Sequence, residues 1–410
     1  MTTGSPPTSS PISAATRRSI LLLSFATFSS MASQRLCDAM LPELARVFSV
    51  TLSQAARVVS VFAIVYGLSQ LFYGPLGDRL GKFRVVMTAT LLCAAGSAWA
   101  VAAADLDALV LARVLVALGA AAIIPLSLAW IGDVVAVDQV QETLARVGLG
   151  TTLGIVGGQI MGGLFTDTLG WRWAFGFMAV LFGGVGCLLA GDWRRQRAAP
   201  VAARADGARS NAPRPRHAAQ VWAIVSGRWT GGVLAVAFLE GAAGFGVIAM
   251  WASHLHRALG FTLGAAGAVV ALYGLGGMLY MAVARRLIRR FGAHGLAALG
   301  VVLFALSAAV IAFTSWRLPV LPASLVAGFG FFMFHNTMQA QATQMAPSAR
   351  GTSVSMFALS LFLGQSVGVG LAAAVIDRLG SRSVIALGAG VVLVVGLVFA
   401  QALRARARPA

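Results

Sequence analysis

The sequence predicts an all-helical membrane protein of twelve transmembrane helices, arranged as two pseudo-symmetric halves of six helices each. Its composition, its recurring long apolar segments and an internal repeat support this prediction. Of the 410 residues, 58% are hydrophobic and only 11% are charged, whereas soluble domains carry about 25% charged residues. So few charges cannot coat a water-exposed surface, which argues against a soluble multidomain enzyme.

Apolar segments long enough to cross a bilayer, which takes about 20 residues, recur along the chain. They lie at 19–42, 53–77, 84–104, 108–132, 144–166, 171–191, 229–255, 262–284, 295–314, 319–345, 352–376 and 383–403. Backbone polar groups inside hydrocarbon must be satisfied internally, so each segment is expected to be a helix. The first segment is too long for the apolar core of a signal peptide, and we expect it to be retained as a span.

The segment 192–228 is rich in Arg, Ala and Pro and is expected to be a flexible linker between the halves. The expected units are a disordered tail at 1–18, an N-terminal six-helix bundle at 19–191, this linker, a C-terminal six-helix bundle at 229–403, and a basic tail at 404–410. The three cysteines, Cys37, Cys93 and Cys187, lie in apolar runs. They predict neither a disulfide framework nor a metal site.

The net charge of +18 would suggest nucleic acid as a partner in a soluble protein. If both termini are cytoplasmic, most basic residues fall on one side of the membrane. They are Arg17, Arg18, Arg79, Lys82, Arg84, the linker arginines, Arg285, Arg286, Arg289, Arg290, Arg350, Arg404, Arg406 and Arg408. This is the positive-inside bias, so the expected partner is the lipid bilayer of the inner membrane and not nucleic acid.

An internal repeat relates the two halves. The four tyrosines of the chain form two matching segments, Tyr66–Tyr73 and Tyr273–Tyr280, offset by 207 residues. Two further landmarks repeat at nearly the same offset: Gly158-Gln159-x-x-Gly162 recurs as Gly364-Gln365-x-x-Gly368, and Gly170-x-Arg172 recurs as Gly380-x-Arg382. Parallel repeats of six helices are expected to form a central site near the midplane, between the halves.

The loop after the second span, GPLGDRLGKFR at 74–84, resembles the signature G-x-x-x-D-R-x-G-x-R/K-R/K of the major facilitator superfamily. The matching residues are Gly74, Asp78, Arg79, Gly81, Lys82 and Arg84. The resemblance implies a latch that holds the outward-open state. In it, Asp78 caps a helix of the other half and Arg79 reaches an acid at the end of the fourth span, here Asp133. A carboxylate at a helix start and an exposed ion pair are favourable but breakable.

Other segments resemble the drug–proton antiporter branch of that superfamily. They are Arg113 in the fourth span, the glycines Gly150, Gly154, Gly158 and Gly162 in the fifth, Gly170-Trp171-Arg172-Trp173, and Asp38-Ala-Met-Leu-Pro42 in the first. The four glycines share one helix face and should let another helix approach closely. The sequence departs from the antiporter motif at Gln159, which replaces a proline.

Of the thirteen acidic residues, only Asp38 and Glu240 lie within spans. A membrane-embedded carboxylate is costly unless paired or protonated, so both are candidate proton carriers. Arg113 is at a depth that suits pairing with Asp38, and His335 lies at the depth of Glu240 and can titrate near neutral pH. The alternative readings stay open: Asp38 could only neutralise Arg35, and His335 could be a packing group.

The expected substrate cavity adds polar and aromatic positions on the same helices, although each could equally be packing. They are Arg35, Tyr66, Tyr273, Trp251, Asn336 and Gln339. No nucleotide-binding loop or hydrolase motif is present, so neither an enzyme nor a cofactor is expected. The resemblance implies a monomer that exports a small organic molecule in exchange for protons. The alternatives are an exporter of a sugar, siderophore or other metabolite, a proton-coupled importer, and a non-transporting membrane sensor.

Overall fold

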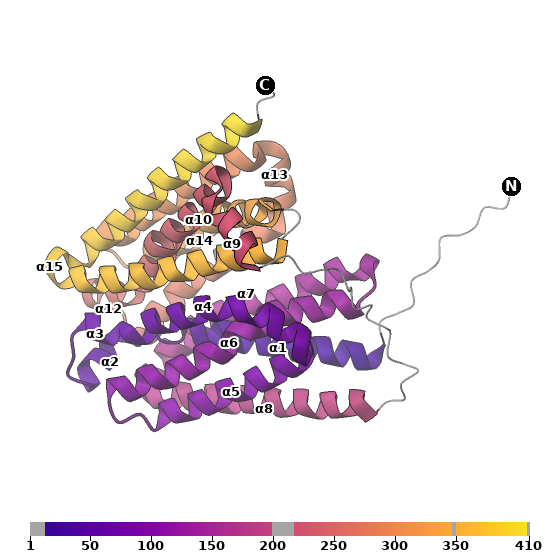
Figure 1. Cartoon of the computed structure of the whole chain (residues 1–410). Coiled ribbons are helices and arrows are strands. Elements are labelled where there is room, and N and C mark those ends of the chain that lie inside the picture. The colour runs from indigo at the N-terminus through magenta and orange to yellow at the C-terminus, as the bar shows by residue number, and fades with distance from the viewer. Residues whose placement is uncertain (1–12, 199–216, 347–349, 408–410) are drawn as a thin grey trace.

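The computed structural model describes residues 13–198, 217–346 and 350–407, and the described residues form helices joined by short connections (Figure 1). The helices are α1 (Ala14–Arg35), α2 (Leu41–Val47), α3 (Leu52–Ala55), α4 (Arg57–Leu80), α5 (Lys82–Val101), α6 (Leu106–Val134), α7 (Val137–Thr168), α8 (Trp171–Ala198), α9 (His217–Ser226), α10 (Arg228–Glu240), the π-helix η2 (Gly241–Phe245), α11 (Gly246–Ile248), α12 (Trp251–Leu259), α13 (Leu263–Phe313), α14 (Val320–Gln344) and α15 (Arg350–Ala407). The all-helical prediction is confirmed.

The predicted spans correspond to these helices. Ten described helices are long and apolar enough to cross a membrane, and the stretch Leu263–Phe313 counts among them as one. That stretch bends at Gly292, whose φ of 64° only glycine adopts readily, so it contains two of the predicted spans. Counting its two arms separately and adding α1 gives the predicted twelve helices.

Several predicted boundaries are displaced because helices continue past the apolar segments. The helix α1 begins at Ala14, inside the expected N-terminal tail, where Ser13 caps it by accepting a hydrogen bond from the Thr16 amide. Both ends of the expected linker are helical, in α8 and α9, and residues 199–216 lie outside the described part. At the other terminus, α15 extends to Ala407. Basic residues near a helix C-terminus favour such extension, because they complement its partial negative charge.

The two six-helix halves lie side by side, with α1–α8 in one and α10–α15 in the other (Figure 1). Across their interface α4 faces α15, where the rings of Tyr66 and Phe362 are 4.5 Å apart, and α7 faces α13. We call the end of the bundle where α1 begins and α15 ends the terminal end, and the other the distal end.

The glycine face of α7 packs directly on the backbone of α1. A Cβ added at Gly158 or Gly162 would lie 2.3 Å from the Ala32 carbonyl oxygen or 2.0 Å from that of Leu36. The second half repeats both sides of this contact: the corresponding glycines of α15 meet the carbonyl oxygens of Phe238 and Ala242, each 206 residues further along the chain. The internal repeat is therefore a repeat of packing.

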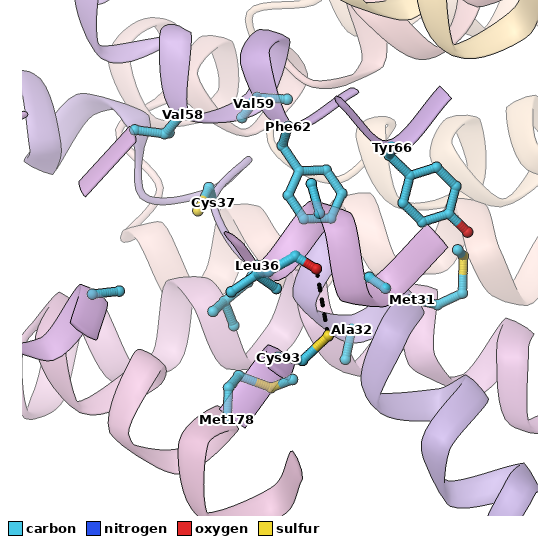
Figure 2. Packing of buried hydrophobic residues seen from close by; sticks show 14 of the residues in the cluster. Met31, Ala32, Leu36, Cys37, Val58, Val59, Phe62, Tyr66, Cys93 and Met178 are labelled. Atoms are coloured by element: carbon cyan, nitrogen blue, oxygen red, sulfur yellow. Dashed lines mark hydrogen bonds between the residues drawn. The ribbon is translucent and has the colours of Figure 1, made fainter. Parts of the chain in front are cut away.

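The core of the first half surrounds this contact. Figure 2 shows Leu36 and Cys37, from the turn after α1, in one apolar cluster with Phe62 of α4, Cys93 of α5 and Met178 of α8. The Cys93 thiol donates a hydrogen bond to the Val116 carbonyl oxygen at 3.4 Å. All three cysteines are free, and Cys37 and Cys93 behave as small apolar side chains in this core.

Candidate functional site

The first embedded carboxylate, Asp38, lies where the first span breaks. The helix α1 ends at Arg35 and α2 begins at Leu41, and the residues between them form a turn. Pro42 explains the break, because proline has no amide hydrogen and its ring clashes with the carbonyl four residues earlier, here that of Asp38. Irregular backbone at membrane depth is tolerated only where protein or a cavity surrounds it, and Asp38 is 1% exposed.

Two side chains hold one oxygen of Asp38. Arg35 Nη1 lies 3.4 Å from Asp38 Oδ2, and Gln159 of α7 donates a hydrogen bond to the same oxygen at 2.9 Å. Among the described residues, Asp38 Oδ1 has no hydrogen-bond partner although it is buried. This free oxygen could take a proton without disturbing the two contacts already made.

Arg113 does not form the ion pair with Asp38 that the sequence predicts. Its Nη1 donates to the backbone oxygen of Ser33 at 2.9 Å, its Nε donates to that of Val58 at 3.3 Å, and its guanidinium lies 4.0 Å from the centre of the Phe62 ring. The ion pair goes to Arg35 because the turn after α1 brings Asp38 back over the end of its own helix. Arg113 ties α6 to α1 and α4.

The second embedded carboxylate, Glu240, lies at a second irregularity. It ends the regular helix α10 and is followed directly by the π-helix η2. Single π turns inside helices are rare and occur frequently at functional sites. The His335 Nδ1 lies 2.9 Å from Glu240 Oε1, so the predicted proximity of these two residues is observed. Glu240 Oε2 is buried and finds no hydrogen-bond partner in the described part of the chain.

Phe245, which no sequence pattern singles out, connects the two carboxylate sites. The Arg35 guanidinium lies 4.8 Å from the centre of its ring, a cation–π distance, although the two residues belong to different halves. The centres of the Phe245 and His335 rings are 5.8 Å apart. Successive side-chain contacts through Arg35, Phe245 and His335 thus connect Asp38 with Glu240.

Apart from Arg35, the expected cavity residues divide into a buried group and a more exposed group. Tyr66, Tyr273 and Trp251 are buried and pack against other rings, with Tyr273 and Trp251 6.2 Å apart between their centres. Asn336 is half-buried and Gln339, one turn beyond His335 towards the terminal end, is exposed. Arg35 is the expected cavity residue that contacts an embedded carboxylate.

The expected latch loop is seen with a different pairing. Lys82 Nζ lies 2.5 Å from Asp133 Oδ2, so the cation that reaches the acid at the end of α6 is Lys82 and not Arg79. Lys82 begins α5 directly after Gly81, whose φ of 91° turns the chain from α4 back along α5 and brings Lys82 beside α6. The expected capping of a helix of the other half by Asp78 stays a prediction.

Gln159 is a further residue of this site that the sequence did not predict. The pattern showed it only as a departure from the antiporter motif, yet the glycines beside it bring its helix onto α1 and its side chain onto Asp38. A polar side chain within a glycine face is the signal that could have found it. No cluster of three or more His, Cys, Asp or Glu side chains able to hold a metal ion occurs within the described ranges.

Two breaks in transmembrane helices, each with a buried carboxylate, occur in the two six-helix repeats, and this arrangement is expected of a secondary transporter. The chain belongs to the Major Facilitator Superfamily, whose sequence model matches residues 23–369 and 233–410. Its members are transporters and not enzymes, in agreement with the sequence analysis.

Solved structures of this family share the fold. The chain aligns with a bacterial homologue of the human lysosomal transporter Spinster at a TM-score of 0.73 and 17% identity, over 98% of this chain and 100% of that one. It aligns with a POT family transporter bound to a thioalcohol-conjugated peptide at a TM-score of 0.77 and 13% identity, over 95% and 97%. At these identities the likeness concerns the fold alone.

Relatives by sequence match only part of the chain. The multidrug export protein EmrB of Haemophilus influenzae is 28% identical over 156 residues, which are 38% of this chain and 30% of EmrB. The riboflavin transporter RibZ of Clostridioides difficile is 25% identical over 35% of this chain and 32% of its own length. The uncharacterized transporter YgaY of Escherichia coli O157:H7 is 29% identical over 40% and 41%. The matches thus span well under half of each relative.

Proposed function

We propose that the chain exports a small organic molecule in exchange for protons, with Asp38 and Glu240 as the groups that bind them. The observation that carries the proposal is that each carboxylate is buried, lies at a helix break and keeps one oxygen without a partner among the described residues. Protonation removes the cost of burying the charge, so each site can be occupied by a proton in one conformation and vacated in another.

Coupling follows if substrate and proton compete for these groups. A ligand shifts a conformational equilibrium only by its difference in affinity between the two states. A substrate that contacts Arg35 or His335 would weaken the contacts of these side chains with their carboxylates, and so alter how readily the carboxylates hold protons. The two halves would rock about the central site, with the loop at 74–84 closing the terminal end in the outward-open state.

The direction of transport rests on similarity. EmrB is an export protein by its name, and the segment Asp38–Pro42 and the glycine face of α7 resemble antiporter motifs. We further propose that the protein lies in the inner membrane with both termini and the expected linker in the cytoplasm, because this orientation places most arginines on the inner side. We also propose that it acts as a monomer.

The test uses inside-out membrane vesicles that hold an imposed pH gradient, acid inside, read by a pH-sensitive dye. A panel of toxic organic compounds is added one at a time. A compound that dissipates the gradient only when the protein is present is taken into the vesicle in exchange for protons. An importer coupled to protons in symport would not dissipate this gradient on addition of its substrate outside, so the assay separates the two directions.

Variants then test the proton sites with the best compound. Asp38→Asn and Glu240→Gln should each abolish exchange driven by the pH gradient. Asp192→Asn is the matched control: Asp192 is also buried, but it lies at the terminal end, where it accepts a hydrogen bond from Ser19 and pairs with Arg18. The proposal fails if both site variants exchange protons as the unmodified protein does.

A further inference from the structure

Asp167 carries its charge at the wrong end of its own helix. It lies in the last turn of α7, where the partial negative charge of a helix C-terminus disfavours a carboxylate, and no basic residue is present in that turn. Asp167 is also exposed, so burial does not account for its position. Its contacts lie in the other half of the molecule.

The carboxylate of Asp167 binds the first two amides of α13. The Leu263 amide donates to Asp167 Oδ1 at 3.1 Å, and the Gly264 amide donates to Oδ2 at 2.5 Å. These are among the amides that a helix start leaves without a partner in its own helix. A negative charge there is also favoured by the helix dipole, so the α13 start offsets the penalty at the α7 end.

The first half shows what the second half lacks at this point. Both second spans of the repeat begin with Thr-Leu, at Thr51 and at Thr262. In α3, Thr51 and Gln54 form a complete capping box within the helix. In α13, Thr262 caps the Ala265 amide at 3.1 Å, but alanine stands where α3 has glutamine. The acceptors that complete the start of α13 come from Asp167, across the interface.

The backbones around this contact touch. A Cβ at Gly163 would lie 2.2 Å from the Leu263 carbonyl oxygen, and a Cβ at Gly267 would lie 2.4 Å from that of Gln159. A Cβ at Gly264 would lie 3.0 Å from Asp167 Oδ2 itself. The two halves are therefore closed at the distal end along two turns of α7 and α13. Towards the terminal end of α14, by contrast, side chains pass from buried Phe331 to exposed Gln339.

We propose that Asp167 is a distal latch, which holds the halves together at this end and must release when the end opens. The expected latch of the loop at 74–84 acts at the opposite, terminal end. The equilibrium between the state closed at the distal end and the state closed at the terminal end then depends on both latches, and weakening one latch favours the state that the other holds. This role concerns the alternation of the halves and is independent of the substrate and of proton coupling.

Distances between spin labels at the distal end test the proposal directly. Labels are attached to Ala104→Cys in the first half and Trp316→Cys in the second, both exposed positions, after the exposed native thiol is removed as Cys187→Ser. Asp167→Asn keeps the size of the side chain but loses the charge. We expect the ratio of long to short distances to rise about threefold to tenfold, because charge-assisted hydrogen bonds are lost at an exposed site.

Glu43→Gln is the matched control, because Glu43 is an acid at the same end whose partner, Arg46, lies in the same helix. It should leave the distance distribution unchanged, and Asp167→Glu should restore part of the short population. If Asp167→Asn does not yield folded protein, Gly264→Ala provides the same test by crowding the carboxylate. Distributions identical to the parent in every folded variant would overturn the latch, whatever the outcome of the proton-exchange assays.

Discussion

Gln159 donates a hydrogen bond to Asp38 from the helix that also contacts the other half of the molecule. Its side chain holds the carboxylate at 2.9 Å, and its backbone oxygen faces Gly267 of α13 across the interface. One residue thus both holds the Asp38 side chain in position and takes part in the contact between the two halves.

Replacing this glutamine should weaken proton coupling while leaving the fold intact. Gln159→Leu removes the donor to Asp38, and we expect gradient-driven exchange to slow by about tenfold, as for a loss of about 1.4 kcal/mol. Gln365 is the matched control, since it occupies the same position in the second repeat, where Gly244 stands in place of an acid. Gln365→Leu should change the exchange rate little. Equal effects of both substitutions on transport would show that Gln159 acts only by packing.

The glycine face of α7 should not tolerate a methyl group at Gly162, where it lies against α1. In Gly162→Ala the new Cβ would lie 2.0 Å from the Leu36 carbonyl oxygen, so α1 and α7 must separate, at a cost of about 1–3 kcal/mol. Thermal unfolding of the detergent-solubilised protein, followed by tryptophan fluorescence, measures the change. Gly148→Ala on the same helix meets nothing within 4 Å and should unfold at the temperature of the parent protein.

Arg113 should be required for stability as well as for any part in coupling. Arg113→Lys keeps the charge but cannot reach Ser33 and Val58 together while lying over the Phe62 ring. We expect a loss of about 2 kcal/mol in the free energy of unfolding, because buried acceptors lose their partner. Arg57→Lys, at an exposed arginine paired with Asp107, serves as the control. A stable Arg113→Lys protein without transport would instead assign the residue to coupling alone.

The Lys82–Asp133 pair should affect turnover more than stability. Both side chains are partly exposed, and such pairs contribute below about 1 kcal/mol. Asp133→Asn should therefore leave the unfolding temperature nearly unchanged and slow exchange a few-fold, because the loop at 74–84 is less well held. The charge swap Lys82→Asp with Asp133→Lys should recover part of the rate. Glu142→Gln, at an exposed ion pair with Arg146, is expected to have no effect on turnover.

The fold was accessible from sequence because its causes are local. Long apolar segments must be helices in a membrane, and glycines four residues apart must share a face, so periodicity predicts the twelve helices and a close helix contact at the glycine face of α7. That the partner is α1 is seen only in the structure. The repeat needed only the constant offset of a few landmarks.

The site was only partly accessible, because its contacts depend on backbone irregularities and on the partner half. The turn after Arg35 pairs Asp38 with that arginine, an alternative that stayed open from the sequence, and not with Arg113. Depth along a span could not decide between the two arginines. Phe245, which contacts Arg35, lies in η2, the π-helix that follows Glu240, and the sequence pattern does not predict this irregularity. Likewise, the spacing of charges in the loop at 74–84 could not distinguish Lys82 from Arg79 as the partner of Asp133.

Each embedded carboxylate has its basic partner within its own half: Asp38 with Arg35 in the first, Glu240 with His335 in the second. Rocking the halves therefore parts neither of these two carboxylates from its described partner in a medium of low dielectric constant, where separating opposite charges would be most expensive. What parts at the centre is the cation–π contact of Arg35 with Phe245, a weaker attraction. This pairing keeps the electrostatic barrier to alternation low, and under the proposed mechanism the charge of each half changes through protonation and not through the motion.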